Sequence, residues 1–581
     1  MHDRRSFLAY FSGVGLTSTL FPGVLWAKVE EAKEDAKADS QKSDGQAVAR
    51  LTREMLRSAA LVAGLDLSDA QIDTMLNDYN LHLAEYADLR RVPFDNGVAP
   101  PLYFNPVVPG MTIDRERRPM RLSKPPKVER PKNLEDAAFW PVTHLAELIR
   151  TRQATSVELA EMYLARIQRH NPALLCVVTF TEELALRQAR EADREIAANR
   201  YRGPLHGIPY GAKDICAARG YPTTWGAETF RTRVIDADST VVARLNAAGA
   251  VLVAKLATGE LALDDVWFGG QTKNPWDLSM GSQGSSCGPG SATASGLVGF
   301  SIGTETLGSI VEPSGICGVT GMRPSFGRIS RHGVMAFSWS LDKTGPMCRS
   351  VEDCALVLAA IQGPDGKDLA VQDVPFNWDA SLDIRKLRVG YLKAAFEDTR
   401  QTPQVNANDA AALEKIRSLG VSLIEVAMPA HANVDATAIM YGEATAALRD
   451  PVESQPAKLV RQDRVTKQNS YRLLPAADYF NAQRMRMLLM QEMAAIMEKV
   501  DVYIAPFDYG DYTPNPVSNV NTSVTNLTGQ PCVAVPHGFN EKGQPTCLVF
   551  HGRVYGEAQM LALANAYQSA TEWHLKHPKL G

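Results

Sequence analysis

The pattern of apolar and polar positions predicts two helices near the N-terminus, then an extended segment, then a long stretch of alternating helices and strands. Apolar residues of the first helix recur at helical spacing before Gly64, at Val48, Leu51, Met55, Ala59 and Val62. Ser68 and Gln71 form a capping box for the second helix. Residues 93–133 then carry nine prolines, which predicts an extended surface strap rather than a helix or a sheet interior. We therefore expect residues 47–135 to be a helical extension followed by this strap.

From residue 136 onward, helical patterns alternate with short apolar runs. Thr155 and Glu158 form another capping box, and the helix that they begin is predicted to end near His170. A further helix is predicted over 181–199, and the apolar run at 251–253 reads as a buried strand. Alternation of this kind predicts an α/β fold with helices layered on a large mixed, mostly parallel central sheet.

Composition agrees with a folded protein and excludes some functions. The chain has 581 residues, of which 45% are hydrophobic and 22% charged, as in an ordinary globular protein with a sizeable core. Its net charge of −4 gives no support to nucleic-acid binding, which usually needs a basic face. The eight cysteines include no CxxC pair, so free buried thiols are expected. Since HExxH and nucleotide-binding glycine loops are also missing from the sequence, we expect no metal and no cofactor.

The first 27 residues look like a targeting segment. Arg4 and Arg5 precede Phe7, Leu8 and an apolar run, as in a twin-arginine export signal. The alternative is a retained membrane helix, but glycines and a proline interrupt the run, and a spanning helix needs about 20 strongly apolar residues. We expect a signal over 1–27, a disordered linker over 28–46, transient contact with the twin-arginine export machinery, and a periplasmic or secreted protein.

The candidate chemistry lies in a serine- and glycine-rich stretch, residues 281–314, together with Lys213. Ser309 is a candidate nucleophile, and a serine hydroxyl needs a base that takes its proton. Lys213 could be that base if burial lowers its pKa, and Ser285 could link the two. A turn before Ser309 could present four backbone amides to an oxyanion, those of Thr306, Leu307, Gly308 and Ser309.

These motifs resemble those of the amidase signature family, which cleaves amides through a Ser–cis-Ser–Lys triad. The resemblance covers roughly 140–362 and 480–575 and includes the segments PLHGIPYGAKD, KNPWD, GSSCGPGSA and GTETLGS. It implies that Lys213 is the base, that Ser285 bridges after a cis peptide bond, and that Ser309 is the nucleophile. It also implies a catalytic domain over 136–581, in which the variable part, 363–480, shapes the substrate pocket.

The sequence departs from the family pattern at three positions: Glu305 replaces an Asp, while Leu307 and Cys287 each replace a Gly. Leu307 is therefore expected to place a side chain where the oxyanion loop normally has none.

The predicted function is hydrolysis of a carboxamide C–N bond in a small-molecule amide through an acyl-enzyme. An esterase or carbamate hydrolase using the same triad stays open, as do a subunit similar to glutamine amidotransferases and a non-catalytic binding protein. Another alternative is a nucleophile elbow, G-x-S-x-G, with Ser286 attacking, although no apolar strand is predicted before it. The sequence does not fix the oligomeric state, and a homodimer is one option.

Overall fold

The computed structural model of the protein describes residues 51–73, 75–76, 79, 96–98, 100–398, 400–434, 436–462, 468, 470–509 and 515–580. The chain divides into two units, residues 1–93 and 94–581. The predicted signal over 1–27 and the predicted linker over 28–46 lie outside the described residues.

The first unit contains the first predicted helix, α3 (Arg53–Val62). Its N-terminus is capped by Thr52, whose hydroxyl accepts a hydrogen bond from the Met55 N–H at 3.2 Å. The predicted capping box at the next helix is confirmed, because the Ser68 N–H donates to Gln71 Oε1 at 2.9 Å and the Gln71 N–H donates to Ser68 Oγ at 3.4 Å. Val48, assigned to the first helix from the sequence, lies outside the described residues.

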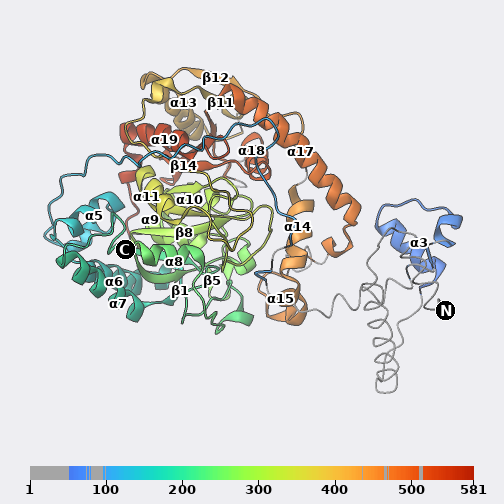
Figure 1. The fold of residues 1–581 in the computed structure, drawn as a ribbon, viewed down its shortest axis with the longest axis horizontal. Coiled ribbons are helices and arrows are strands. Elements are labelled where there is room, and N and C mark those ends of the chain that lie inside the picture. The colour runs from blue at the N-terminus through green and yellow to red at the C-terminus, as the bar shows by residue number, and fades with distance from the viewer. Residues whose placement is uncertain are drawn as a thin grey trace, which may run out of the picture. The chain divides into compact units, whose positions relative to one another are not determined.

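The second unit is built on an eleven-stranded sheet (Figure 1). In spatial order its strands are β1 (Val177–Phe180), β3 (Val251–Leu256), β2 (Pro209–Lys213), β8 (Phe300–Glu305), β10 (Lys343–Cys348), β9 (Thr320–Arg323), β14 (Cys532–Phe539), β15 (Pro545–Gly552), β13 (Val502–Pro506), β11 (Val389–Leu392) and β12 (Leu423–Val426). The predicted α/β fold with a large mixed sheet is confirmed.

Parallel pairing is confined to two groups of three strands. β2 pairs in parallel with β3 and β8, and β11 pairs in parallel with β12 and β13. The other six pairings in this sheet are antiparallel, so the parallel share is smaller than the sequence pattern suggests. Short connections such as residues 540–544, between β14 and β15, join neighbouring strands directly and require antiparallel pairing.

Helices pack on both faces of the sheet. The helices described in this unit are α5 (Val142–Arg150), α6 (Ser156–Leu174), α7 (Glu182–Ala197), α8 (Thr240–Ala247), α9 (Cys287–Ala294), α10 (Val311–Cys317), α11 (Val351–Ile361), α12 (Lys393–Phe396), α13 (Pro403–Ser418), α14 (Ala436–Ala447), α15 (Arg449–Ser454), α17 (Ala476–Lys499), α18 (Pro516–Leu527) and α19 (Glu557–Thr571). Alternate residues of β14 show the two layers, since Val533 packs in the cluster that contains α19 and Ala534 packs in the one that contains α10.

The helices and the strand that the sequence predicted between residues 155 and 253 are present in this unit. α6 begins at the predicted capping box of Thr155 and Glu158, but it runs past His170 to Leu174. It ends there because Leu175 adopts a left-handed conformation and the Asn171 side chain accepts hydrogen bonds from the next two N–H groups. The predicted helix over 181–199 is α7, and the strand at 251–253 extends to Leu256.

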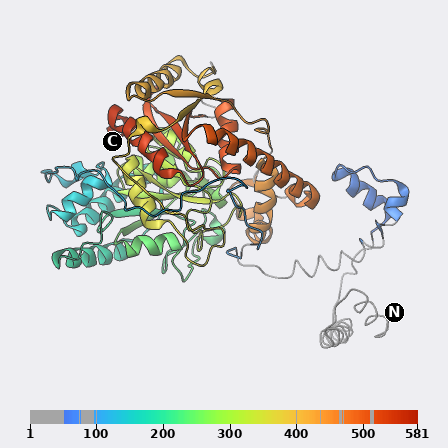
Figure 2. The ribbon, with the colours of Figure 1, turned by 45° about the horizontal axis from the view of Figure 1, so that its top comes forward.

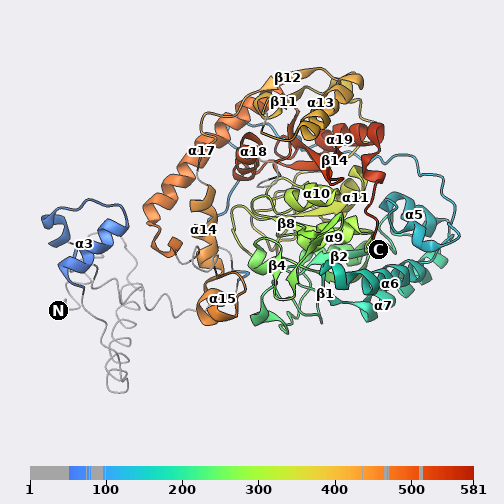
Figure 3. The ribbon, with the colours of Figure 1, turned by 180° about the vertical axis from the view of Figure 1, so that it is seen from behind.

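One helix of the variable region, α14, packs beside the long helix α17, which begins at the end of that region. Figures 1 and 3 show α17, in orange, beside α14, and the turned view in Figure 2 also places α17 at the edge. Among the described residues, no helix combines the length and the apolar character that crossing a membrane requires. All eight cysteines are buried and free, as predicted.

Residues 100–133 form no helix and run along the second unit as an extended strap. Backbone hydrogen bonds attach the strap, such as those from the Arg121 N–H to the Trp378 carbonyl at 2.9 Å and from the Ser123 N–H to Glu352 Oε1 at 2.7 Å. Arg130 also pairs with Glu158 at 2.8 Å.

Candidate active site

The fold brings the three predicted triad residues to one edge of the sheet. Lys213 is the last residue of β2, and β8 runs parallel beside it and ends at Glu305. The ends of two neighbouring parallel strands lie at the same edge, so Lys213 lies next to the turn that carries Ser309. Ser285 lies just before α9, and the Ser286 N–H donates to the Ser309 carbonyl at 3.2 Å, which joins the serine loop to this turn.

Lys213 is buried and surrounded by hydroxyl groups. Its Nζ lies 2.8 Å from Ser285 Oγ, 2.9 Å from Thr304 Oγ1 and 3.1 Å from Ser286 Oγ. Burial lowers the pKa of this amine to about 7, although nearby acidic groups oppose the change. The neighbouring Asp214 does not pair with it, because Asp214 binds Lys255 at 2.8 Å instead. Lys213 therefore has the environment that a neutral lysine base requires.

Ser309 lies at the end of the turn and has a free hydroxyl. The Gly284–Ser285 peptide bond is cis, as the family resemblance implies. Among the described residues, Ser309 Oγ forms no hydrogen bond, so the structure brings Lys213 and Ser285 into direct contact but does not bond Ser309 to either. Catalytic hydrogen bonds often tighten only when substrate is present, so this geometry is compatible with a role as nucleophile.

The turn after β8 presents unused backbone donors. Within the described part of the chain, the N–H groups of Thr306, Leu307, Gly308 and Ser309 donate to no protein acceptor. Gly308 has a φ of +86°, in the region that favours glycine, and an added Cβ there would lie 2.1 Å from Glu312 Oε1. The Leu307 side chain packs beside a buried apolar cluster. The turn therefore accommodates this leucine and keeps its glycine where the backbone needs one.

Glu305, which replaces the usual Asp, holds this turn by hydrogen bonds to the backbone that follows it. Its Oε2 accepts hydrogen bonds from the N–H groups of Ile310 at 2.9 Å and Val311 at 3.1 Å, at the start of α10. Its Oε1 accepts from Arg323 at 2.7 Å and from Asn526 at 2.9 Å. Burial alone would raise the pKa of this carboxyl, but the charges of Arg323 and Lys343 and the hydrogen bonds lower it to about 2.

Ser286 is poorly suited to be the nucleophile. A short strand does precede it, contrary to expectation, but β7 (Asp277–Gly281) pairs only with β6 (Lys273–Asn274) and stands outside the central sheet. The Ser286 hydroxyl is buried, donates to the Thr304 carbonyl at 3.0 Å and accepts from the Thr304 N–H at 3.1 Å. It positions β8 beside Lys213 and has no free path to a substrate.

The sequence analysis did not predict two further residues of the site, because nothing in the sequence indicated which groups they would contact. Thr304 lies within the GTETLGS motif and supplies a second hydroxyl to Lys213. Asp342 accepts a hydrogen bond from Thr306 Oγ1 at 2.6 Å and another from the Phe337 N–H at 2.7 Å. It therefore connects the oxyanion turn to a loop 30 residues further on.

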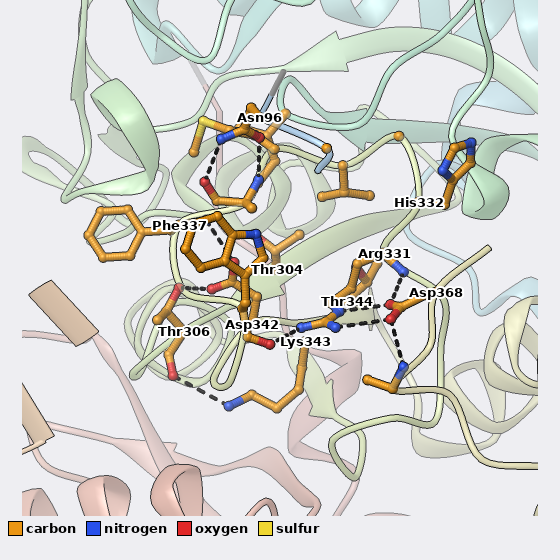
Figure 4. Close-up of a pocket in the computed structure, with 18 of the residues that line it drawn as sticks. Asn96, Thr304, Thr306, Arg331, His332, Phe337, Asp342, Lys343, Thr344 and Asp368 are labelled. Carbon is orange, nitrogen blue, oxygen red and sulfur yellow. Dashed lines mark hydrogen bonds and ion pairs between the residues drawn. The ribbon is translucent and has the colours of Figure 1, made fainter. Parts of the chain in front are cut away.

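A cavity of about 200 Å³ lies beside this site, and Figure 4 shows its lining. The lining includes Thr304, which contacts Lys213, and Thr306, but not Lys213, Ser285 or Ser309 themselves. Most of the other lining residues come from 96–103 and from 331–344. Among the described residues of the variable region at 363–480, the cavity lining takes 367–370.

Comparisons with known proteins identify the family of this chain. The family model described as Amidase matches residues 158–561. The A-type subunit of the glutamyl-tRNA(Gln) amidotransferase from Methylococcus capsulatus is 34% identical over 481 residues, which cover 75% of this chain and 98% of that protein. The corresponding subunit from a Roseiflexus species is 35% identical, over 75% of this chain and 97% of its own.

Solved structures share the fold. A peptide amidase from Stenotrophomonas maltophilia has a TM-score of 0.67 at 30% identity and covers 75% of this chain and 98% of its own. A bacterial aryl acylamidase of the amidase signature enzymes has the same TM-score at 20% identity, over 75% and 97% of the two chains, a likeness of fold alone. The chain therefore belongs to the amidase family and is an enzyme that cleaves amide C–N bonds.

Proposed function

We propose that this protein hydrolyses carboxamides with Ser309 as nucleophile and with Lys213 as a base acting through Ser285. Ser309 Oγ attacks the carbonyl carbon while its proton passes to Ser285 Oγ, whose own proton passes to the neutral Nζ of Lys213. The carbonyl oxygen becomes an oxyanion and accepts hydrogen bonds from the turn at 306–309. Each such donor is typically worth about 3 kcal/mol in the transition state.

The same relay then runs in reverse. When the tetrahedral intermediate collapses, the C–N bond breaks and the leaving amine takes a proton from Ser285, which regains one from Lys213. An ester of Ser309 remains. Water attacks this ester, gives its proton to the relay, and releases the carboxylic acid and the free Ser309 hydroxyl. The atoms balance with water as the only co-reactant.

The observation that carries this proposal is the buried amine of Lys213, held 2.8 Å from Ser285 Oγ and unpaired with any carboxylate among the described residues. The test measures hydrolysis of a panel of amides, esters and carbamates by the wild type, Ser309→Ala and Lys213→Ala. We expect each substitution to reduce kcat by about 10³-fold or more. Amide hydrolysis that persists in Ser309→Ala would refute the proposed nucleophile, and the panel decides between amides, esters and carbamates.

A second candidate is a subunit that releases ammonia from an amide for transfer to another acceptor. Its support is the identity of 34% to a glutamyl-tRNA(Gln) amidotransferase component. The purified chain alone should hydrolyse simple amides under our proposal. Activity that appeared only with glutamine and added partner subunits would favour the second candidate instead.

We also propose that the protein is exported in its folded state by the twin-arginine machinery and works in the periplasm or outside the cell. The support is the sequence: Arg4 and Arg5 before a modest apolar run. The test expresses the wild type or the double variant Arg4→Lys, Arg5→Lys in cells and measures the protein in each cell fraction. The wild type should appear outside the cytoplasm and the variant should stay inside, while equal distribution would refute export by this route.

A further inference from the structure

The cavity beside the triad has a wall that comes from outside the family region. The Amidase model begins at residue 158, whereas the strap contributes Asn96, Leu102 and Tyr103 to the cavity lining. This wall is therefore a property of this chain and not one that the family match supplies. The lining also includes Met335 and Phe337.

The strap is anchored on both sides of Leu102 and Tyr103, by Asn96 before them and by Phe104 after them. The Asn96 side chain donates to the Ala336 carbonyl at 3.1 Å and accepts from the Ala336 N–H at 2.7 Å, as Figure 4 shows. It also donates to the Ala447 carbonyl at 2.9 Å. At the other side, the Phe104 ring packs edge-on against Phe326 at 5.0 Å, and the Arg486 guanidinium lies 3.6 Å from its centre. Leu102 and Tyr103 are therefore held in place.

A continuous set of hydrogen bonds leads from the strap to the oxyanion turn. Asn96 binds both backbone groups of Ala336. The next residue, Phe337, donates its N–H to Asp342, and the other carboxylate oxygen of Asp342 accepts from Thr306 Oγ1. The strap thus contacts the loop that fixes the first residue of the turn.

Most of the cavity surface is apolar, and Thr304 and Thr306 carry hydroxyl groups at the end near Lys213. The lining also includes charged side chains, those of Arg331, Asp342, Lys343, Lys367 and Asp368. Leu102 and Tyr103 are 71% and 55% exposed, so a ligand in the cavity would cover apolar surface that water now contacts. Phe337, which also lines the cavity, is buried. An apolar group fits such walls, and Thr304 and Thr306 place it next to the reacting centre.

We propose that Asn96, Leu102 and Tyr103 of the strap form one wall of the substrate pocket, and that this pocket takes a bulky apolar group of the amide, such as an aromatic ring. The inference rests on the proposed function, because the cavity is assigned to the substrate of the triad. It gives the strap the role of a specificity-determining element. Leu102 and Tyr103 would contact the ring, and Asn96 acts as a positioning residue.

The test measures kcat/KM for three amides that differ in the placement of a ring: acetamide, phenylacetamide and N-benzylacetamide. Leu102→Ala and Tyr103→Ala should lower kcat/KM for at least one ring-bearing amide by about tenfold relative to kcat/KM for acetamide. Tyr103→Phe, which keeps the ring, should behave as the wild type. The control Leu122→Ala removes an exposed leucine of the strap that does not line the cavity. It should leave kcat/KM unchanged for all three amides.

The possible outcomes separate the two proposals. Equal losses for acetamide and the ring-bearing amides, or no loss for any, would overturn the role of the strap while leaving the triad intact. A wild type that hydrolyses none of the three would instead refute the proposed function, and the pocket assignment with it. Thermal unfolding of each variant shows that the changes in rate do not come from loss of the fold.

Discussion

At the scale of single residues, the proposed chemistry depends on the protonation of Lys213. Burial lowers its pKa to about 7, and only the neutral amine can accept a proton. We therefore predict that kcat/KM rises with pH through about 7. Lys213→Arg, which keeps a positive charge that cannot be removed, should lose activity at every pH. A flat profile between about pH 5 and 9 would contradict a lysine base.

Glu312 predicts a second feature of the pH profile. It lies three residues after Ser309 on α10, where side chains lean back toward the helix start, and its Oε1 is close to Gly308. Burial and the charges of Glu305 and Asp264 raise its pKa to about 8. Ionised Glu312 would oppose the growing negative charge on the oxyanion, so activity should fall again above about pH 8.

The variant Glu312→Gln tests this assignment because it keeps the shape of the side chain and removes the ionisation. The acidic limb near pH 7, which belongs to Lys213, should be unchanged, while the decline at alkaline pH should disappear. A decline that persists in Glu312→Gln would assign it to another group.

At the scale of elements, β8, the turn and α10 work as one unit that Glu305 holds together. Glu305→Gln would leave the Arg323 guanidinium without its buried charge partner, and breaking such a pair typically costs about 3–5 kcal/mol. We predict a lower free energy of unfolding together with reduced kcat, since the turn loses its support. Urea unfolding and hydrolysis rates measure the two effects.

Asp383→Asn provides the matched control for Glu305→Gln. Asp383 pairs with Arg385 at 2.7 Å on the surface, where the exchange should leave both stability and kcat as in the wild type. If Glu305→Gln also left both unchanged, the turn would not depend on this carboxylate.

The sequence predicted elements better than their contacts. Capping boxes at Thr155 and Ser68 mark helix starts because their hydrogen bonds join residues three apart. The three residues of the proposed triad could be named from the sequence because they lie in family motifs. By contrast, the pairing of Asp214 with Lys255 joins residues 41 apart, and the antiparallel centre of the sheet depends on which strands meet. Neither this ion pair nor the strand pairing produces a periodic or local pattern in the sequence.

At the scale of the whole molecule, the cavity and the triad are built entirely from the unit that spans residues 94–581. The strap belongs to this unit, although its composition alone indicated only a surface segment. Its prolines remove backbone donors and prevent a helix, so it stays extended and can reach from the cavity at Asn96 to the start of α6 at Glu158.

Two truncations separate the roles of the units. A chain that starts at residue 94 keeps the triad, the cavity and Asn96, and we predict that it folds and hydrolyses both acetamide and ring-bearing amides as the full chain does. A chain that starts at residue 104 lacks Asn96, Leu102 and Tyr103 but keeps the Phe104 anchor. Because it loses the Asn96 contact with Ala336 as well as the apolar wall, kcat/KM should fall for every amide, and by about tenfold more for the ring-bearing amides than for acetamide. If the first truncation folded by thermal unfolding but was inactive, residues 1–93 would take part in catalysis, and the active unit would have to be extended to include them.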